Sequence, residues 1–267
     1  MLNPRIIPCL LVHNNGLVKT KGFKDPAYVG DPLNAVKIFN EKSVDELFVL
    51  DIDATAKNKE PNYDLISKIA MECQMPLCYG GGISNINQII KILKMGVEKI
   101  AISTLAIKNP KLIKETAKLT GNQSIVVVMD VKKKKFSSNF NIFLNNGKNN
   151  TGKSLIDHCK LVEDFGAGEI VINSIDNDGM MNGFDLKLIN QVKNSISIPL
   201  TVLGGAGSLE DIGKVISENG IIGVAAGSLF VFKGKYKAVL INYPSHNEKE
   251  NLIFKSLERY ETNNTKH

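Results

Sequence analysis

Residues 75–84 read MPLCYGGGIS and residues 198–208 read IPLTVLGGAGS, so one pattern of a short apolar run followed by a glycine cluster occurs twice. An internal repeat of this kind indicates two halves of one domain that share the same fold. Two further segment pairs follow in the same order: Leu50–Asp53 with Ser174–Asp178, and Ala101–Thr104 with Ala225–Ser228.

Short runs rich in Val, Ile and Leu alternate with amphipathic stretches along the chain, which is typical of buried parallel strands joined by helices. The expected strands are Ile6–Val12, Glu46–Asp51, Pro76–Tyr79, Lys99–Ile102, Ile125–Asp130, Glu169–Asn173, Pro199–Leu203 and Gly223–Ala226. The expected helices include Leu33–Glu41, Asn85–Lys94, Pro110–Leu119, Ser154–Phe165, Leu186–Lys193 and Leu209–Glu218. The alternation predicts an α/β fold, a (β/α)8 TIM barrel made of two duplicated half-barrels.

Length and composition agree with one such barrel, because the chain has 267 residues and 43% of them are hydrophobic. We expect the barrel over residues 1–234 and a C-terminal extension, residues 235–267, that packs on the barrel or trails from it. No run of eighteen apolar residues and no signal pattern occurs, so we expect a cytoplasmic protein that does not enter a membrane. The cysteines lack metal-type spacing, so we expect no disulfide, no metal and no cofactor: Cys9, Cys73, Cys78 and Cys159.

The formal charge of +6 is moderate, and its main local cluster is Lys132–Lys135, which an Asn-rich stretch follows as far as Asn150. Such a run indicates a solvated hairpin or an interaction edge. No recognition motif and no interleaved aromatic residues accompany it, so we do not expect nucleic-acid binding. The charge suits anionic small molecules better.

Each glycine cluster follows a strand, where backbone can pass close to an anion and the next helix offers free N–H groups. Each is paired with a second strand that ends in small or hydroxylated residues. Tight turns also use glycine for steric reasons alone, but two matching sites in matching halves favour phosphate binding. The candidate phosphate-binding residues are Gly81, Gly82, Ser103 and Thr104 in the first half, and Gly204, Gly205, Gly227 and Ser228 in the second.

Between these two sites a catalyst would lie at the carboxyl ends of the strands, where barrels hold their active sites. Asp130 ends the apolar run Ile125–Met129, and Asp178 follows the sixth strand. We take both as candidate catalytic residues. For the other aspartates near strand ends we favour a role in capping helices or bracing loops: Asp51, Asp53 and Asp176.

A third catalytic candidate is Lys19, in the long polar segment from His13 to Asp31. A connection of this length is often a lid, and a lid lysine can meet substrate charge on closure, although it can also be one more exposed lysine. No histidine pairs with a cysteine or serine in a nucleophile pattern, so we do not expect a hydrolytic triad: the four are His13, His158, His246 and His267.

Several of these motifs together resemble the HisF family, the cyclase subunit of imidazole glycerol phosphate synthase. The resemblance extends over about residues 1–232, which makes it far more specific than any one pattern. The motifs are Arg5–Leu10, Gly80–Ile83, Val128–Asp130, Asn149–Gly152, Gly166–Glu169, Ser174–Gly179 and Gly204–Gly207.

This resemblance implies ammonia chemistry. A separate glutamine amidotransferase subunit would dock at the N-terminal face of the barrel, and ammonia would travel through the barrel to a phosphorylated small-molecule substrate at the other end. The family has a ring of alternating charges at the entrance to this channel. The matching residues, read here as an ammonia gate, are Arg5, Glu46, Lys99 and Glu169.

The departures from the family pattern concern the catalytic end. Leu11 stands where the family has the aspartate that works opposite Asp130, and loss of one general acid or base typically lowers a rate by ~10²- to 10⁴-fold. Leu203 replaces a usual serine and Asn173 a usual threonine. Residues 234–244 lack the helical ending expected of the histidine enzyme.

In these respects the chain is similar to HisF-like proteins of surface-polysaccharide gene sets, which supply ammonia for sugar amidation with an amidotransferase and a third, amidating protein. We therefore expect a HisF-like synthase subunit, of lyase or cyclase type, that serves surface-glycan biosynthesis. Two alternatives stay open: a cyclase of histidine biosynthesis, and a scaffold that activates the amidotransferase without chemistry of its own. An intact site with bound phosphates at the top of the barrel would count against the scaffold, and an occluded site would support it.

Overall fold

The computed structural model describes residues 3–134, 137 and 139–265. Lys135, part of the predicted basic cluster, and His267 lie outside the described residues.

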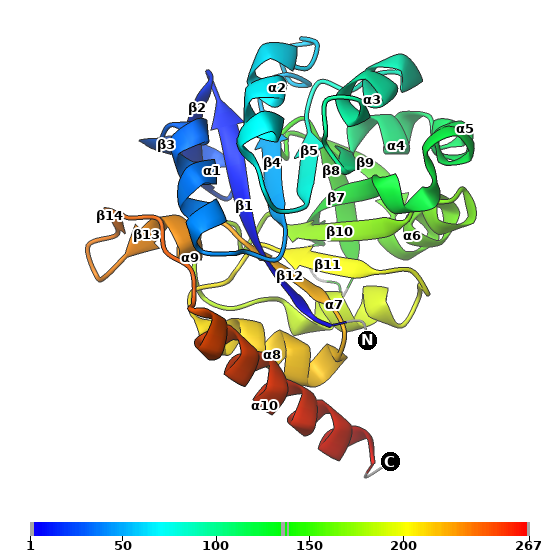
Figure 1. Cartoon of the computed structure of the whole chain (residues 1–267). Coiled ribbons are helices and arrows are strands. Elements are labelled where there is room, and N and C mark those ends of the chain that lie inside the picture. The colour runs from blue at the N-terminus through cyan, green and yellow to red at the C-terminus, as the bar shows by residue number, and fades with distance from the viewer. Residues whose placement is uncertain (1–2, 135–136, 138, 266–267) are drawn as a thin grey trace.

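Eight parallel strands close into a barrel surrounded by helices, as Figure 1 shows, because the last barrel strand pairs in parallel with the first. All eight predicted strands are confirmed. They are β1 (Arg5–His13), β4 (Leu47–Asp51), β5 (Leu77–Gly80), β6 (Lys99–Ile102), β7 (Ile125–Lys133), β10 (Glu169–Ser174), β11 (Leu200–Leu203) and β12 (Gly223–Ala226). The fold is thus the predicted (β/α)8 barrel.

The strands carry apolar residues on both faces, since one face lines the lumen of the barrel and the other packs against the helices. The outward residues form the main core with the helices. The inward residues form a separate, smaller apolar cluster: Ile7, Cys9, Phe48, Cys78, Ala101, Val126, Val128, Val171, Leu203 and Ala225. The four cysteines are free thiols.

The helices between the strands follow the apolar periodicity of the sequence. The six predicted ones appear as α1 (Pro32–Glu41), α3 (Ile86–Leu93), α5 (Lys111–Thr120), α6 (Leu155–Asp164), α7 (Leu186–Lys193) and α8 (Leu209–Asn219). The structure adds α2 (Tyr63–Glu72), the short helices α4 (Thr104–Lys108) and α9 (Ser228–Val231), and the 3-10 turn Asn122–Ser124.

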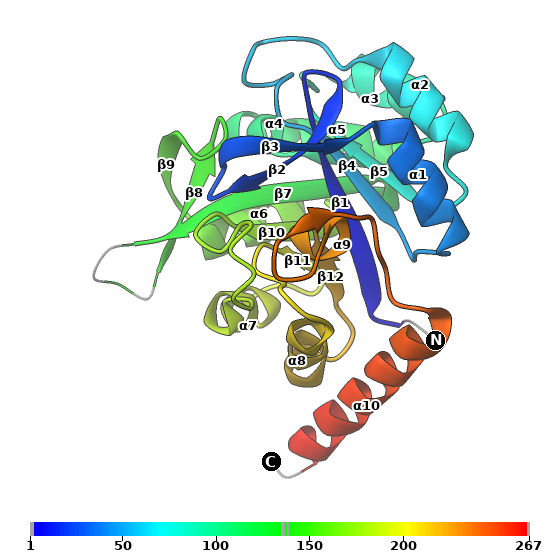
Figure 2. The ribbon, with the colours of Figure 1, turned by 90° about the vertical axis from the view of Figure 1, so that its left-hand side faces the viewer.

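Two antiparallel hairpins stand at the carboxyl ends of the strands, where Figure 2 shows them side by side. The first, β2 (Gly16–Lys21) and β3 (Lys24–Gly30), occupies the segment predicted as a lid and extends β1. The second, β8 (Phe140–Leu144) and β9 (Asn149–Ser154), extends β7 within the lysine- and asparagine-rich stretch. Long barrel strands therefore continue directly into the walls around the mouth.

The C-terminal part begins with a small hairpin, β13 (Phe232–Lys233) and β14 (Ala238–Val239), and ends in the long helix α10 (His246–Asn264). Residues 234–244 contain no helix, as expected, but α10 follows and was not predicted. It packs against α8 on the outside of the barrel (Figure 1). Gly213 permits this close approach, because a Cβ there would lie 2.9 Å from Leu252 Cδ1.

Candidate functional site

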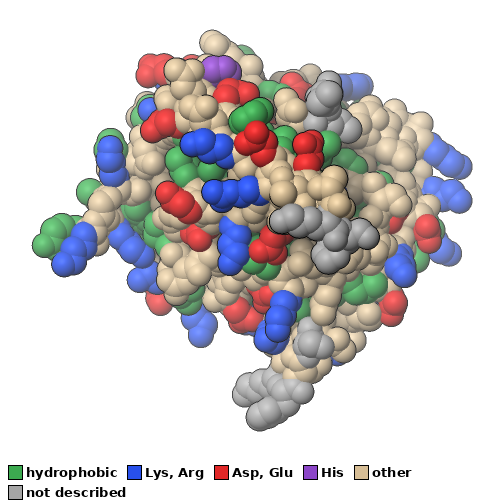
Figure 3. Space-filling view, turned by 90° about the horizontal axis from the view of Figure 1, so that it is seen from below, with side chains coloured by type: hydrophobic (Ala, Val, Ile, Leu, Met, Phe, Trp, Pro, Cys, Tyr) green, Lys and Arg blue, Asp and Glu red, His purple; other side chains and the backbone are tan. Residues whose placement is uncertain are grey.

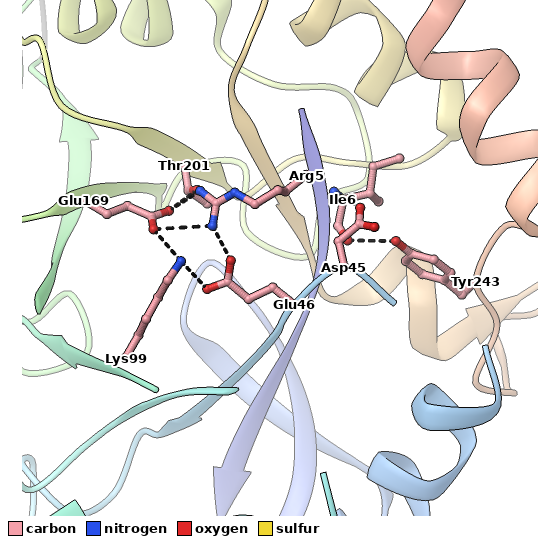
Figure 4. A network of polar contacts seen from close by, with 8 residues as sticks. All are labelled: Arg5, Ile6, Asp45, Glu46, Lys99, Glu169, Thr201 and Tyr243. Carbon is pink, nitrogen blue, oxygen red and sulfur yellow. Dashed lines mark hydrogen bonds and ion pairs between the residues drawn. The ribbon is translucent and has the colours of Figure 1, made fainter. Parts of the chain in front are cut away.

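A closed ring of ion pairs crosses the lumen at the N-terminal ends of the strands (Figure 4). Arg5 contacts Glu46 and lies 2.7 Å from Glu169, while Lys99 Nζ lies 2.8 Å from Glu46 and 2.9 Å from Glu169. Thr201 Oγ1 also donates to Glu169 Oε1 at 2.5 Å. The four residues predicted as a gate thus meet in one network from four different strands or strand starts.

The two carboxyl groups of the ring differ in their surroundings. Burial favours a higher pKa for both carboxyl groups. For Glu46 burial outweighs the opposing effect of Arg5 and Lys99, so its pKa is raised. For Glu169 the nearby Arg5 and Lys99 outweigh burial, so the pKa of this carboxyl is held below its usual range. Glu169 is therefore the firmly charged centre of the ring.

The C-terminal part fastens the strand that carries Arg5. Tyr243 donates its hydroxyl hydrogen to the carbonyl of Ile6 at 2.9 Å, and the Ile6 N–H donates to Asp45 at 2.9 Å (Figure 4). Asp45 in turn pairs with Lys249 of α10. We call Asp45, Tyr243 and Lys249 the C-terminal clamp, because they hold the backbone next to the ring from outside.

Above the ring the lumen is lined by apolar side chains. Along β10 the inward positions are Glu169, Val171 and Asn173, so a charged level, an apolar level and a polar level follow in order. An uncharged molecule crosses such a wall at low free-energy cost, whereas an ion loses its hydration there. The lumen thus separates two polar ends of the barrel.

At the carboxyl ends of the strands lies a large open pocket, which encloses about 1340 Å³ including its mouth. Nearly every predicted residue of the top site lines it: Lys19, Gly81, Ser103, Thr104, Asp130, Asp178, Gly204, Gly205, Gly227 and Ser228. Gly82 is not among the lining residues, and its N–H donates to Thr55 Oγ1 at 3.0 Å. The structure therefore brings the two half-barrel sites and the three catalytic candidates together around one space.

The glycine clusters have a steric reason as well. Gly81 and Gly205 have φ of +126° and +127°, and a Cβ would come within 2.4 Å of the Asp51 carbonyl and 2.2 Å of the Gly183 carbonyl. The helices that follow are capped by their own side chains, Asn85 for α3 and Ser208 for α8. The short helices α4 and α9 also begin at this pocket, and no side chain caps their N-termini, so any anion in these cradles would meet the glycine backbone, the hydroxyl groups and these two open helix ends.

Asp130 lies at the floor of the pocket, where Asn173 Nδ2 donates to its Oδ1 at 2.9 Å. Burial raises the pKa of Asp130 to about 7, the Asn173 hydrogen bond opposes this rise and Asp178 adds to it. A carboxyl with this pKa can gain or lose a proton near neutrality, which suits a general acid or base. Leu11 and Leu203 line the same pocket, so neither offers Asp130 a polar partner.

The other two candidates meet at the first hairpin. Thr20 Oγ1 donates to Asp178 at 2.7 Å, and Lys19 donates to the Cys9 carbonyl inside the barrel. Lys19 is only 5% exposed, and burial lowers its pKa. A Cβ on Gly227 would lie 2.5 Å from Lys19 Nζ, so this amino group lies directly against the glycine of the second predicted phosphate site. Lys19 is thus not an ordinary surface lysine.

The aspartates expected to brace loops do so. Asp51 accepts N–H groups of Asp53 and Ala54, and Asp176 accepts that of Lys133 at 3.0 Å. Asp53 binds the Asn14 N–H and lies 2.8 Å from His13.

Sequence reasoning missed the contribution of the second hairpin to the pocket. Asn145 and Asn146 at its turn line the pocket, and Asn146 Nδ2 reaches across to the Ile52 carbonyl at 2.9 Å. Both have positive φ, of 52° and 54°. The signal was the run Asn145-Asn146-Gly147, a turn sequence between two strands.

In the described part of the chain no cluster of three or more His, Cys, Asp or Glu side chains could hold a metal ion. No described helix has the length and apolar character to span a membrane. Figure 3 shows Lys and Arg interspersed with Asp and Glu on the face seen from below, rather than a field of one sign.

Comparison with known proteins agrees with this geometry. The family model described as "Histidine biosynthesis protein" matches residues 5–237. A Leptospira borgpetersenii protein provisionally named imidazole glycerol phosphate synthase subunit HisF is 58% identical over 95% of this chain and all of its own length. The provisionally named hisF2 of Pseudomonas aeruginosa is 47% identical over 93% of this chain and 98% of its own, and Clostridium botulinum HisF is 40% identical over 87% and 92%. The chain therefore belongs to the histidine biosynthesis protein family, as a HisF-like subunit.

Proposed function

We propose that this subunit receives ammonia from a HisH-like glutamine amidotransferase docked at the N-terminal face, and conducts it through the barrel to the mouth. The charged ring is the gate, and the apolar lumen is the channel. Neutral ammonia can move along the apolar lumen, while ammonium and water are disfavoured there.

We further propose that the ammonia serves sugar amidation in surface-glycan biosynthesis rather than ring closure in histidine biosynthesis. The observation that carries this proposal is the pairing of an intact charged ring with a mouth in which Leu11 and Leu203 line the pocket with Asp130. The other two carboxyls that line it, Asp51 and Asp178, accept hydrogen bonds from loop N–H groups and from Thr20. A leucine transfers no proton, so the two-carboxylate reaction lacks one partner.

The names of the relatives support the proposal. Among the similar proteins are hisF2 of Pseudomonas aeruginosa and hisF3 of Vibrio vulnificus, the latter 54% identical over 95% of this chain. Such numbers mark additional HisF copies, and an additional copy is free to serve a second pathway.

A third, amidating protein would take the ammonia at the mouth. The hairpin of β13 and β14 offers a surface for it, because Tyr236 is 91% exposed between Lys235 and Lys237. The hairpin follows directly on α9, whose Ser228 lines the pocket.

The top site is not occluded, so the observation that would have supported the scaffold alternative is not met. The histidine-pathway cyclase remains the second candidate, because Asp130 keeps a pKa suited to acid–base catalysis.

The test is steady-state turnover of the histidine-pathway nucleotide with saturating ammonium and no amidotransferase. We expect the wild type to be inactive and Leu11→Asp to regain measurable turnover, while the equally small Leu11→Asn, which cannot exchange a proton, stays inactive. Wild-type turnover as fast as that of a histidine-pathway enzyme would instead support histidine biosynthesis.

A further inference from the structure

The upper end of the lumen carries one polar pair. Asp130 on β7 and Asn173 on β10 are register partners, and the residues below them on the same faces are Val128 and Val171. Leu203 on the next strand is the register partner of Asn173 on its other side. A molecule rising from the ring of ion pairs therefore meets an apolar wall until it reaches this pair.

Of the two polar atoms of the Asn173 carboxamide, one makes a hydrogen bond and the other does not. Its Nδ2 donates to Asp130, while its Oδ1 is buried without a hydrogen-bond partner, and the residue is 6% exposed. A buried acceptor left unsatisfied is destabilising, so such an atom is a candidate to accept a hydrogen bond from a bound group or a water molecule. Asn173 also lines the pocket, so its side chain borders the space in which a ligand would lie.

The pair selects for one kind of ligand. Asn173 Oδ1 can only accept, and among the described residues the second carboxyl oxygen of Asp130 has no hydrogen-bond partner. Two neighbouring acceptors, one of them anionic when ionised, fit a small group that has several N–H donors and a positive charge. Ammonium meets this description, and the leucine side chains beside it limit competition from water.

We propose that Asp130 and Asn173 form a landing site for ammonia at the upper end of the lumen, a role that rests on the proposed passage of ammonia through the barrel. Arriving ammonia takes the proton of the neutral Asp130 carboxyl and is held as ammonium between the carboxylate and Asn173 Oδ1. Before the nitrogen attacks an electrophile, the proton returns to Asp130 and restores the nitrogen lone pair. Asn173 positions the ion and takes no part in the proton transfer.

The ionisation of Asp130 fits this exchange. With a pKa of about 7, the carboxyl is neutral often enough to protonate ammonia and acidic enough to release the proton. The nearby Asp178 carboxyl accepts hydrogen bonds from Thr20 Oγ1 and the Phe23 N–H, whereas Leu11 offers the cation no oxygen.

The test uses thallium(I), a heavy monovalent cation that replaces ammonium in oxygen-lined sites and is located by its anomalous scattering. In wild-type crystals at pH 8 we expect a thallium peak between Asn173 Oδ1 and Asp130, which disappears at pH 5 because Asp130 is then neutral. Ammonium chloride should displace the peak, and sodium chloride at the same concentration should not.

Matched variants decide the role of the amide. Asn173→Leu, of similar size, should lose the peak, whereas Asn145→Leu at the rim of the same pocket should keep it. Absence of the peak in the wild type, its survival in Asn173→Leu, or equal displacement by sodium would overturn the landing site. The measurement needs neither substrate nor amidotransferase, so its failure is distinct from failure of the sugar-amidation proposal.

Discussion

At the scale of single residues, the mouth of this barrel is defined by what surrounds one carboxyl group. Asp130 sits among apolar side chains with one amide as partner, and its raised pKa follows from that burial. Leu11, which lines the same pocket, supplies this carboxyl with neither a proton nor a charge.

The pKa of Asp130 predicts a pH-dependent stability. Between the unfolded pKa near 4 and the folded value of about 7, the folded chain binds a proton that the unfolded chain has lost, so stability falls as pH rises. Asp130→Asn removes this dependence. We expect urea unfolding to show that the variant gains on the order of 2 kcal/mol relative to wild type between pH 5 and pH 8.

A suitable control for this experiment is Asp64→Asn, which removes an exposed carboxylate paired with Lys68 on α2. Its difference from wild type should stay nearly constant over the same pH range. A constant difference for Asp130→Asn as well would mean that Asp130 is already ionised at pH 5.

The chemical character of these residues could be predicted from the sequence, but their contacts could not. Asp130 and Asp178 stood out because they follow apolar strands. The burial of Lys19 against the Cys9 carbonyl depends on how the first hairpin folds back into the barrel, and no local pattern encodes it. The unpartnered Asn173 Oδ1 likewise depends on which strand neighbours β10.

At the scale of elements, regular periodicity decided what was predictable. Barrel strands were evident as buried apolar runs, while β3 was not, since five of its seven residues are exposed and show no alternation. Helix α10 was missed although Ser245 and Glu248 form a capping box at its start. Its weakly apolar face offers little signal, because three of its nineteen residues are buried and two of these are polar: Lys249, Ile253 and Ser256.

The C-terminal clamp makes a prediction at this scale. Tyr243→Phe removes only the hydrogen bond to the Ile6 carbonyl, whose acceptor is left buried, so we expect a loss of about 1–2 kcal/mol in the free energy of unfolding. Tyr236→Phe alters a side chain that is 91% exposed and should change stability by less than ~0.5 kcal/mol. Equal stability of both variants in chemical denaturation would mean that the clamp contributes nothing.

At the scale of the whole molecule, the barrel has two chemically different ends. One end holds four charges in a closed ring, the other an open pocket with glycine cradles, and an apolar lumen keeps them apart. Strand β10 shows this division within one strand, since its inward residues Glu169 and Asn173 are polar and Val171 between them is apolar.

The ring of ion pairs predicts that its positive and negative side chains stabilise one another across four strands. Lys99→Met leaves Glu46 and Glu169 with Arg5 as their one cation, and we expect a loss of about 2–3 kcal/mol, less than for a fully buried pair because Lys99 is 21% exposed. Adding Glu46→Gln should recover part of this loss, as thermal and urea unfolding of the single and double variants can measure. Strictly additive losses would contradict a coupled ring.

Tyr243 contacts segments next to both ends of the barrel. Its ring packs 5.1 Å from that of Phe230, two residues beyond Ser228 of the second cradle, and its hydroxyl holds Ile6, the neighbour of Arg5. On the outside of the barrel, one aromatic side chain therefore contacts both the helix that begins beside the pocket and the strand that begins at the ring of ion pairs. A displacement of this aromatic ring would alter the surroundings of both ends of the molecule at once.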